Sequence, residues 1–464
     1  MKLNIRNLGK IKKADIELKD LTIICGPNSS NKTWLSYLIG NMLTTIYGHN
    51  YGKDVPEDLG NFVDELKENG EASIEFEKAE AAFYAYLESA IQNSKKTLPN
   101  YFKANNDALS DLDFHLDRSS LTNSVMPIDD WTPISGTVKF YSKNNTVFGS
   151  ILTRDSVEES DHSFEDYLFY SILFISGLVS NHTLIKPHIV SSERTGALMF
   201  QVEVDRSSIL IEQVIRTISD LDIDPDDRKR ITGDLIEQLY ADKSRLPVPV
   251  TKNVEDVRNI ARDKEKQSEL SKSHPEIIEI LDRMNGGQFV VEDGEITFLQ
   301  SSDNKAYKIG STSSSIKSIF IIDLIIRHKL ASRNILLIDE PELNLHPDNQ
   351  RLMARLIVRL INAGVKVLIT THSDFLVREI NNAIALNNDF EGKEAFLAEH
   401  EFIKADLLNG EQVSAYAVDK ESKVNPMPIS KFGIETAIFD ELINKANDFQ
   451  DEILYKIEPT LFED

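Results

Sequence analysis

Two short apolar runs, each ending in polar residues, place the strongest constraint on the fold of this chain. The first spans residues 334–340 (NILLIDE) and the second spans residues 365–372 (VKVLITTH). Both have the length and the continuous apolar character of strands buried on both faces of a sheet. The stretch between them has a helical pattern, and a strand, a helix and a second strand in this order form a parallel unit. The sequence therefore predicts an α/β fold with a parallel-sheet core.

An octet of mostly small polar residues follows a third apolar run, residues 21–25. The octet, GPNSSNKT, spans residues 26–33 and precedes a helical pattern. A loop between a strand and a helix N-terminus is the setting in which backbone N–H groups bind phosphate. We therefore expect a nucleotide-phosphate site here, formed by Gly26, Asn28, Ser29, Ser30, Asn31, Lys32, Thr33 and Trp34.

Two residues of this loop have distinct chemical roles. Lys32 would contact the β- and γ-phosphates as a point charge, and the Thr33 hydroxyl would ligate Mg²⁺. Asn31 stands where the phosphate-loop pattern G-x-x-x-x-G-K-[ST] has its second glycine. Because Asn tolerates positive φ better than other non-glycine residues, the loop can still close, at some strain.

Carboxylates and a histidine end the two strands described first. Asp339 and Glu340 suit a pair in which one residue holds Mg²⁺ and the next activates the attacking water. His372 ends the neighbouring strand, where it could sense a γ-phosphate. The candidate catalytic residues are therefore Lys32, Glu340 and His372; the candidate metal ligands are Thr33 and Asp339; ATP and Mg²⁺ are the expected cofactors.

Spacing sets the expected organisation of the chain. About 300 residues separate Lys32 from Asp339, more than a compact nucleotide-binding fold needs, so insertions must fill the interval. We expect an N-terminal part of the head at 1–205, with a mixed β lobe and a helical insert near 56–118. A helical insertion lobe at 206–284, a C-terminal part of the head at 285–400 and a strand and helix extension at 401–464 follow.

Local patterns add further expectations. Residues 135–153 suggest a hairpin with its turn at 143–145, and residues 186–196 suggest a short strand running into a polar turn. Residues 285–309 suggest two or three strands with turns at 293–294 and 303–304.

Taken together, the motifs resemble the ABC-type ATPases. The match is closer to their SMC, RecF and OLD-like branch, as in standalone AAA-type ATPases of bacterial phage-defence systems. It rests on KLNIRNLGKIKKADIEL, GPNSSNKT, LLIDEPELNLHP and ITTHSDFLV, which together span the chain. The resemblance implies an ABC-ATPase head with a helical insertion that binds and hydrolyses ATP.

The resemblance also implies a second half-site. The family's signature motif precedes the helix leading to the acidic strand, and Ser313, Ser314 and Ser315 occupy that place, with Ser315 where a glycine is usual. The family presents this motif to the nucleotide on the opposite subunit, which implies a homodimer that sandwiches ATP and leaves room for a higher oligomer. Arg194 lies in SSERTG, which looks similar to a family motif near the nucleotide; the alternative is a surface turn.

Three functions stay open at this point. The first is a sensor or scaffold that controls a separate effector, a nuclease or toxin, in antiphage defence; only about 90 residues follow His372, too few for the TOPRIM nuclease lobe of full OLD proteins. The second is a RecF- or SMC-like repair ATPase that clamps DNA directly, which a net charge of −24 disfavours. The third is a nucleotide-binding scaffold with little turnover, because Asn31 and Ser315 both replace glycines.

Other sequence features bear on the compartment. Cys25 is the one cysteine, so no intrachain disulfide can form. The first residues lack the continuous apolar core of a signal peptide, and no later stretch reaches the roughly 18 apolar residues of a membrane span. We expect a cytoplasmic protein with no membrane partner.

Overall fold

The computed structural model describes residues 1–48, 55–104, 106–121, 138–151, 164–179, 185–199, 246–260, 266–292, 295–419 and 421–457. The chain forms two compact units. The first comprises 1–6, 15–17 and 37–187, and the second comprises 7–14, 18–36 and 188–464. Much of the predicted insertion lobe, residues 206–245, lies outside the described residues, so the predicted domain boundaries stay a prediction.

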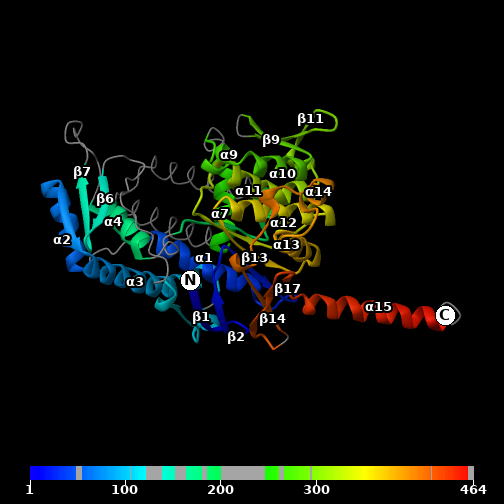
Figure 1. Cartoon of the computed structure of the whole chain (residues 1–464), viewed down its shortest axis with the longest axis horizontal. Coiled ribbons are helices and arrows are strands. Elements are labelled where there is room, and N and C mark those ends of the chain that lie inside the picture. Colours follow the sequence, from blue (N-terminus) through cyan, green and yellow to red (C-terminus); the bar gives the residue numbers. More distant parts are fainter. Residues whose placement is uncertain are drawn as a thin grey trace, which may run out of the picture. The chain divides into compact units, whose positions relative to one another are not determined.

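A six-stranded sheet is the core of the second unit (Figure 1). The strands lie in the order β15-β14-β3-β13-β12-β8. Their bounds are β3 (Leu21–Cys25), β8 (Pro187–Val190), β12 (Ile335–Asp339), β13 (Lys366–Thr371), β14 (Val413–Val418) and β15 (Val424–Pro426). The neighbours β14, β3, β13 and β12 pair in parallel, which confirms the predicted α/β fold with a parallel-sheet core.

The register of these strands brings their carboxyl ends to one edge of the sheet. Asp339 of β12 lies opposite Thr370 of β13, and Thr370 lies opposite Ile24 of β3. All residues of β3 and β12 are buried, as their apolar composition requires. The segments that follow the three strands are therefore neighbours, although they come from distant parts of the sequence.

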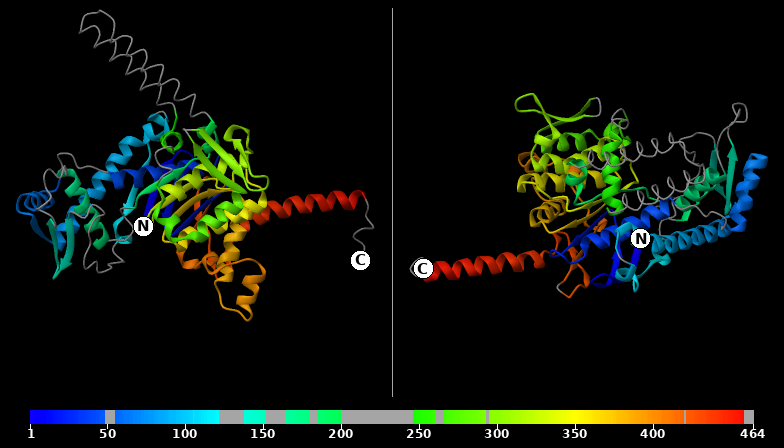
Figure 2. Two further views of the ribbon diagram at one scale, coloured as in Figure 1. Left: turned by 90° about the horizontal axis from the view of Figure 1, so that it is seen from above. Right: turned by 180° about the vertical axis from the view of Figure 1, so that it is seen from behind.

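Helices of the second unit pack around this sheet in one apolar core. In Figures 1 and 2, α10 to α13 lie together beside the strands. The bounds of the helices in the described part of this unit are α7 (Val248–Arg258), α9 (Glu269–Ser273), α10 (Pro275–Asn285), α11 (Ser314–His328), α12 (Pro347–Asn362), α13 (Asp374–Leu386) and α14 (Lys393–Glu399). Helix α1 (Lys32–Gly48) begins in this unit and continues into the first.

A separate antiparallel sheet follows α10. It contains β9 (Gly287–Glu292), β10 (Glu295–Gln300) and β11 (Lys305–Lys308), in the order β11-β10-β9. The predicted strands are thus confirmed, with the turn at 303–304 in place; residues 293–294 lie outside the described residues. Phe298 of β10 is buried, and Phe289 of β9 contacts the Phe320 ring of α11 at 4.9 Å between centroids.

The first unit combines helices and strands. Its elements include β1 (Lys2–Leu8), β2 (Ile11–Glu17), α2 (Glu57–Asn69), β4 (Glu71–Glu75), α3 (Phe76–Phe102), β5 (Asp113–Asp117), β6 (Val138–Lys143), β7 (Thr146–Ile151) and α4 (Phe164–Val179), with β1 and β2 divided between the units. The predicted hairpin is confirmed: β6 pairs with β7 around Asn144 and Asn145, both at positive φ.

The insert near 56–118 is not wholly helical, contrary to the prediction. Gly70 ends α2 in a left-handed conformation, and the five residues of β4 then alternate exposed and buried against β7. β5 pairs with β1. Both strands are short and stabilised by pairing with distant strands, so local helical spacing did not reveal them.

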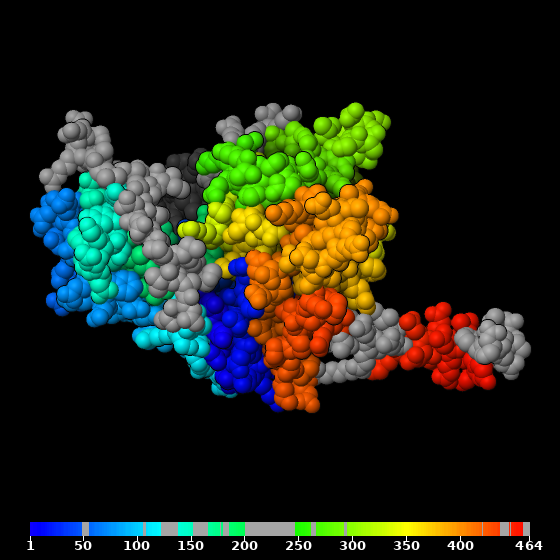
Figure 3. Space-filling view, in the orientation of Figure 1, coloured from blue at the N-terminus to red at the C-terminus, as the bar shows by residue number. Residues whose placement is uncertain are grey.

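Part of the C-terminal segment belongs to the core of the second unit. β14 pairs in parallel with β3, so this part of the predicted extension at 401–464 belongs to the central sheet. The strands β16 (Ile429–Ser430) and β17 (Gly433–Ile434) and the helix α15 (Ala437–Ile457) follow. Along α15, red in Figure 3, the apolar side chains of Phe449, Ile453 and Ile457 are exposed. No helix in the described ranges combines the length and apolar character that a membrane-spanning segment needs.

Candidate active site

The loop after β3 turns sharply into α1. Gly26 has φ 156°, and a Cβ at this position would approach the Val418 carbonyl oxygen of β14 to 3.0 Å. Only glycine therefore lets the loop pass so close to the neighbouring strand. Of the predicted phosphate-contacting residues, Asn28 and Ser29 are exposed, Trp34 is half-buried, and Ser30 is buried with a hydroxyl that has no hydrogen-bond partner.

Ser29 and Asn31 both have positive φ, 61° and 67°. Asn31 therefore adopts the left-handed conformation that the missing glycine would have supplied. Left-handed residues in such a loop help to direct N–H groups to one side, as in anion-binding concavities. The Asn31 side chain packs over Gly9, where a Cβ would lie 2.3 Å from its Nδ2 atom. Lys10 donates to the Ser29 carbonyl oxygen at 3.3 Å.

Substitution of Asn31 tests this conformational demand. Asn31→Gly is expected to keep nucleotide affinity, whereas Asn31→Ala should weaken it by about 1 kcal/mol, roughly fivefold in the dissociation constant. The reason is that alanine, unlike glycine, is strained at φ 67°. Titration of a fluorescent ATP analogue measures both variants. Equal affinities for the two variants would contradict the expectation.

Lys32 is buried at the start of α1, with 5% of its surface exposed. Its ammonium donates to the Pro27 carbonyl oxygen of its own loop at 2.8 Å. Burial lowers the pKa of Lys32, and the nearby carboxylates of Glu340 and Asp339 oppose this shift. The Lys32 ammonium therefore lies inside the loop, and its contact with phosphate stays a prediction.

The two predicted metal ligands lie together. The Thr33 hydroxyl donates to both carboxylate oxygens of Asp339, at 3.1 and 3.0 Å, across 306 positions of sequence. Thr370 also donates to Asp339, from the neighbouring strand. Burial raises the pKa of Asp339, and the hydrogen bonds from Thr370 and Thr33 partly offset it. A hydroxyl and a carboxylate oxygen therefore converge at one point.

Glu340 is in a strained conformation immediately after β12. Its φ is 51°, which is unusual for a residue other than glycine. Its N–H donates to the Thr370 carbonyl oxygen at 3.1 Å. His372 Nδ1 lies 3.6 Å from Glu340 Oε1, and 44% of the His372 side chain is exposed. The candidate base and the candidate sensor are thus neighbours.

The sequence analysis did not assign Glu342, a buried residue at this site. Its Oε1 atom accepts from the Thr371 hydroxyl at 2.8 Å and from the His372 N–H at 2.9 Å. Its Oε2 atom is buried without a partner. Glu342 therefore ties the end of β13 to the segment after β12; its place in the PELNLHP run was the available signal.

The predicted signature residues lie at the start of α11. Ser313 caps the helix by accepting from the Ile316 N–H at 3.3 Å, and the Ser315 carbonyl oxygen accepts from Ser318 Oγ at 2.8 Å. Ser313 and Ser314 are exposed. These hydrogen bonds lie within the helix itself, and Ser315 is half-buried. No hydrogen bond described for the three serines joins them to the residues around Lys32.

Arg194 lies after β8, at the edge strand next to β12. It is fully buried, and its guanidinium donates to backbone oxygens of Ser318, Ser191, Asp339 and Glu340. It is therefore an internal residue and not part of a surface turn. Its role as a nucleotide ligand stays a prediction.

Cys25 ends β3 directly before the loop. Burial raises the pKa of its thiol to about 12, and the negative charge of Glu342 adds to the shift. Because only the thiolate is nucleophilic, DTNB at pH 8 is expected not to label the native protein, and to label one thiol per chain in denaturant. Rapid labelling of the native protein would contradict the buried position of Cys25.

The residues present fit Mg²⁺ and a nucleotide. Mg²⁺ in nucleotide sites takes one or two protein oxygens, with phosphates and water supplying the rest, and Thr33 and Asp339 provide such a pair. The described residues contain no cluster of three or more histidine, cysteine or acidic side chains that could hold a metal ion. Ser30 Oγ and Glu342 Oε2 are buried polar atoms still lacking partners.

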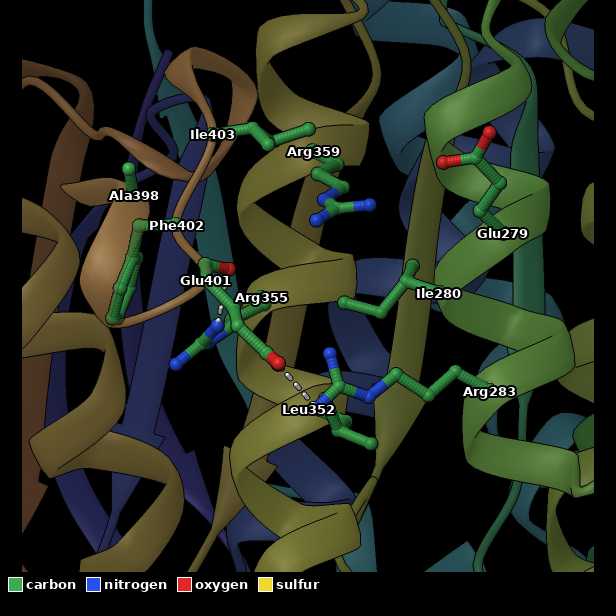
Figure 4. Close-up of a pocket in the computed structure, with 10 residues that line it drawn as sticks. All are labelled: Glu279, Ile280, Arg283, Leu352, Arg355, Arg359, Ala398, Glu401, Phe402 and Ile403. Atoms are coloured by element: carbon green, nitrogen blue, oxygen red, sulfur yellow. Dashed lines mark hydrogen bonds and ion pairs between the residues drawn. The ribbon is translucent and has the colours of Figure 1, made fainter. Parts of the chain in front are cut away.

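A separate cavity of about 480 Å³ lies between α10, α12 and residues 398–403 (Figure 4). The arginines along it are already paired. Arg355 donates to Glu379 at 2.6 Å and its guanidinium lies 3.7 Å from the centre of the Phe402 ring, while Arg359 donates to Asp406 at 2.7 Å. None of the predicted site residues lines this cavity, so we assign it no part in the nucleotide site.

Comparison with known proteins identifies the family of the chain. Residues 1–377 match the AAA ATPase domain family, and the chain belongs to this family. The match confirms the coarser part of the prediction, an ATPase domain. No curated protein matches the chain.

Among the solved structures that are similar to the chain are SMC head domains. One is an Smc head domain with an extended coiled coil, bound to the C-terminal domain of ScpA and derived from Pyrococcus furiosus. It is 14% identical, covers 97% of this chain and 98% of its own, and has a TM-score of 0.31. Another is the SMC head domain from Thermotoga maritima, 12% identical over 92% of this chain and 98% of its own, with a TM-score of 0.29.

Proposed function

We propose that this protein binds and hydrolyses ATP with Mg²⁺ at the loop of residues 26–33. The observation that supports this most strongly is the convergence of Thr33 and Asp339, whose side chains meet at 3.0 Å. Lys32, the strained Glu340 and His372 belong to the same loop cluster. Phosphoryl transfer to water requires groups that bind phosphate, hold Mg²⁺ and activate water. One edge of the sheet here carries two carboxylates, a buried ammonium and a helix N-terminus.

The residues divide the work as follows. Backbone N–H groups around Ser29 and Asn31 and the Lys32 ammonium bind and orient the phosphates. Thr33 and Asp339 would hold Mg²⁺, which neutralises charge on the phosphates when bound. Glu340 accepts a proton from the attacking water, and His372, 3.6 Å from Glu340, contacts the terminal phosphate. Catalysis here is mainly positioning and charge stabilisation.

The proposed assembly is a homodimer closed by ATP. Ser313 and Ser314 are exposed at the N-terminus of α11, where they are available to a nucleotide held by another copy. N–H groups at a helix N-terminus favour negative charge. In this proposal the dimer acts as a sensor or scaffold for a separate effector, a nuclease or toxin, in antiphage defence, within the OLD-like branch of the ATPases.

The rival proposal, a RecF- or SMC-like ATPase that clamps DNA directly, predicts a different behaviour. Phosphate contacts make DNA affinity fall steeply with salt. Titration of a fluorescent DNA duplex at 50 and 200 mM salt, with ATP present, distinguishes the two. Tight binding that is lost at the higher salt would favour the clamp, whereas weak binding at both concentrations would favour the effector role, in accord with the net charge of −24.

Phosphate release and oligomeric mass, measured together, test the proposed function. With Mg²⁺ and ATP, the wild type is expected to release phosphate and to form a larger species that ADP does not support. Absence of both would overturn the proposed ATPase cycle. Nucleotide binding without phosphate release would instead favour the third hypothesis, a scaffold with little turnover. That hypothesis rests on Asn31 and Ser315, which replace glycines.

A further inference from the structure

Arg194 joins three segments that are far apart in sequence. Its Nε atom donates to the Ser318 carbonyl oxygen at 2.8 Å, Nη1 donates to the Asp339 carbonyl oxygen at 2.9 Å, and Nη2 donates to the Glu340 carbonyl oxygen at 2.7 Å. Nη1 also reaches the Ser191 carbonyl oxygen of its own turn, at 3.2 Å. One planar guanidinium thus fixes the end of β12 and the second turn of α11.

The hydrogen bonds of Arg194 at the end of β12 include one to Glu340, the residue with a strained backbone. A non-glycine residue at φ 51° costs of order 1–3 kcal/mol and persists only where its surroundings hold it. Glu340 is held on both sides: its N–H donates to Thr370 and its carbonyl oxygen accepts from Arg194. Because the backbone of Glu340 sets the direction of its Cα–Cβ bond, these two contacts restrict where the carboxylate can point.

The turn that carries Arg194 is itself anchored. Asn253 of α7 is fully buried, accepts from the Ser191 N–H at 2.9 Å and donates to the Ile189 carbonyl oxygen at 2.7 Å. These bonds fix β8 and the start of the turn.

We propose that Arg194 is a positioning residue that aims Glu340 and couples the Glu340 turn to the first turns of α11. The acidic end of β12 and the helix that begins at Ser314 then shift together. This inference rests on the proposed ATPase function, in which Glu340 acts on the nucleotide of its own subunit and α11 faces that of the partner. Arg194 would thus transmit the state of one half-site to the other without contacting nucleotide.

Arg194→Lys tests the proposal because it keeps a positive charge and removes the planar fork. A lysine ammonium cannot reach carbonyl oxygens of three segments in that geometry. Misplacement of a reacting group by about 1 Å costs roughly 100-fold in rate. We therefore expect kcat to fall by about 10- to 100-fold, with the dissociation constant for ATP within about threefold of wild type. Asn253→Ala, which loosens the same turn, should lower kcat less.

Arg359→Lys is the matched control. Arg359 is also a buried arginine of the second unit, and it pairs with Asp406. It lines the separate cavity beside α12 (Figure 4). It should lose a comparable amount of thermal stability but keep kcat. If kcat of Arg194→Lys equals that of the wild type, the positioning role is wrong. If ATP binding is weaker as well, Arg194 is instead a nucleotide ligand.

Hydrogen exchange separates this inference from the proposed function. In Arg194→Lys, but not in Arg359→Lys, amides of residues 339–343 and 314–320 should exchange faster together, even without nucleotide. Faster exchange in both segments supports the coupling whether or not the wild type hydrolyses ATP. Unchanged exchange in either segment overturns the inference. If the wild type binds no ATP but Arg194→Lys still shows this exchange pattern, only the proposed function is overturned.

Discussion

Glu340→Gln is expected to leave ATP bound and to slow hydrolysis by about 10²- to 10⁴-fold, the contribution of a positioned general base. Glutamine has the shape of glutamate but does not accept a proton. The backbone contacts that hold residue 340 at φ 51° do not involve its side chain, so the fold should be kept. Single-turnover phosphate release and ATP titration measure the two effects separately.

The same variant should accumulate the ATP-bound dimer, because closure no longer leads to hydrolysis. Mass photometry with Mg²⁺ and ATP would detect the larger species. Glu399→Gln, which removes an exposed carboxylate of α14, serves as the control and should behave as wild type. Phosphate release by Glu340→Gln at the wild-type rate would mean that another group, with buried Glu342 the first candidate, accepts the proton.

The residues at the carboxyl ends of the strands were the part of this site that the sequence could predict. A short apolar run that ends in Asp339-Glu340 and another that ends before His372 already imply parallel strands, and parallel strands end at one edge. The loop at 26–33 follows the same rule. Strand identity and one elementary fact of sheet geometry therefore sufficed to bring Lys32, Asp339 and His372 together.

The contacts of Arg194 and Glu342 could not be predicted in this way. Arg194 follows an edge strand, and its direction depends on how β8, β12 and α11 pack together, which no local pattern records. β14 illustrates the same limit: its neighbour in the sheet is β3, nearly 400 residues earlier in the chain. The short strands β4 and β5 are likewise stabilised by distant partners and not by their own spacing.

Lys32→Ala is expected to weaken ATP binding by roughly 10- to 150-fold, because a charge-assisted hydrogen bond contributes about 1.5–3 kcal/mol. The Lys32 ammonium is buried inside the loop. Among the described residues, its one hydrogen bond is to the Pro27 carbonyl oxygen. Turnover at saturating ATP should also fall, since the same charge stabilises the transferred phosphoryl group. Calorimetric titration with ATP and Mg²⁺ measures the affinity.

Lys10→Ala separates this effect from the general electrostatics of the loop. Lys10 is exposed and donates to the outer side of the same loop, at the Ser29 carbonyl oxygen. Solvent screens the charge of Lys10, so this charge contributes little to binding of a phosphate. Lys10→Ala should therefore change ATP affinity by less than about threefold. If both variants weaken binding equally, the loop attracts nucleotide only through its net charge. If Lys32→Ala alone does, the buried ammonium is the phosphate ligand that the motif predicts.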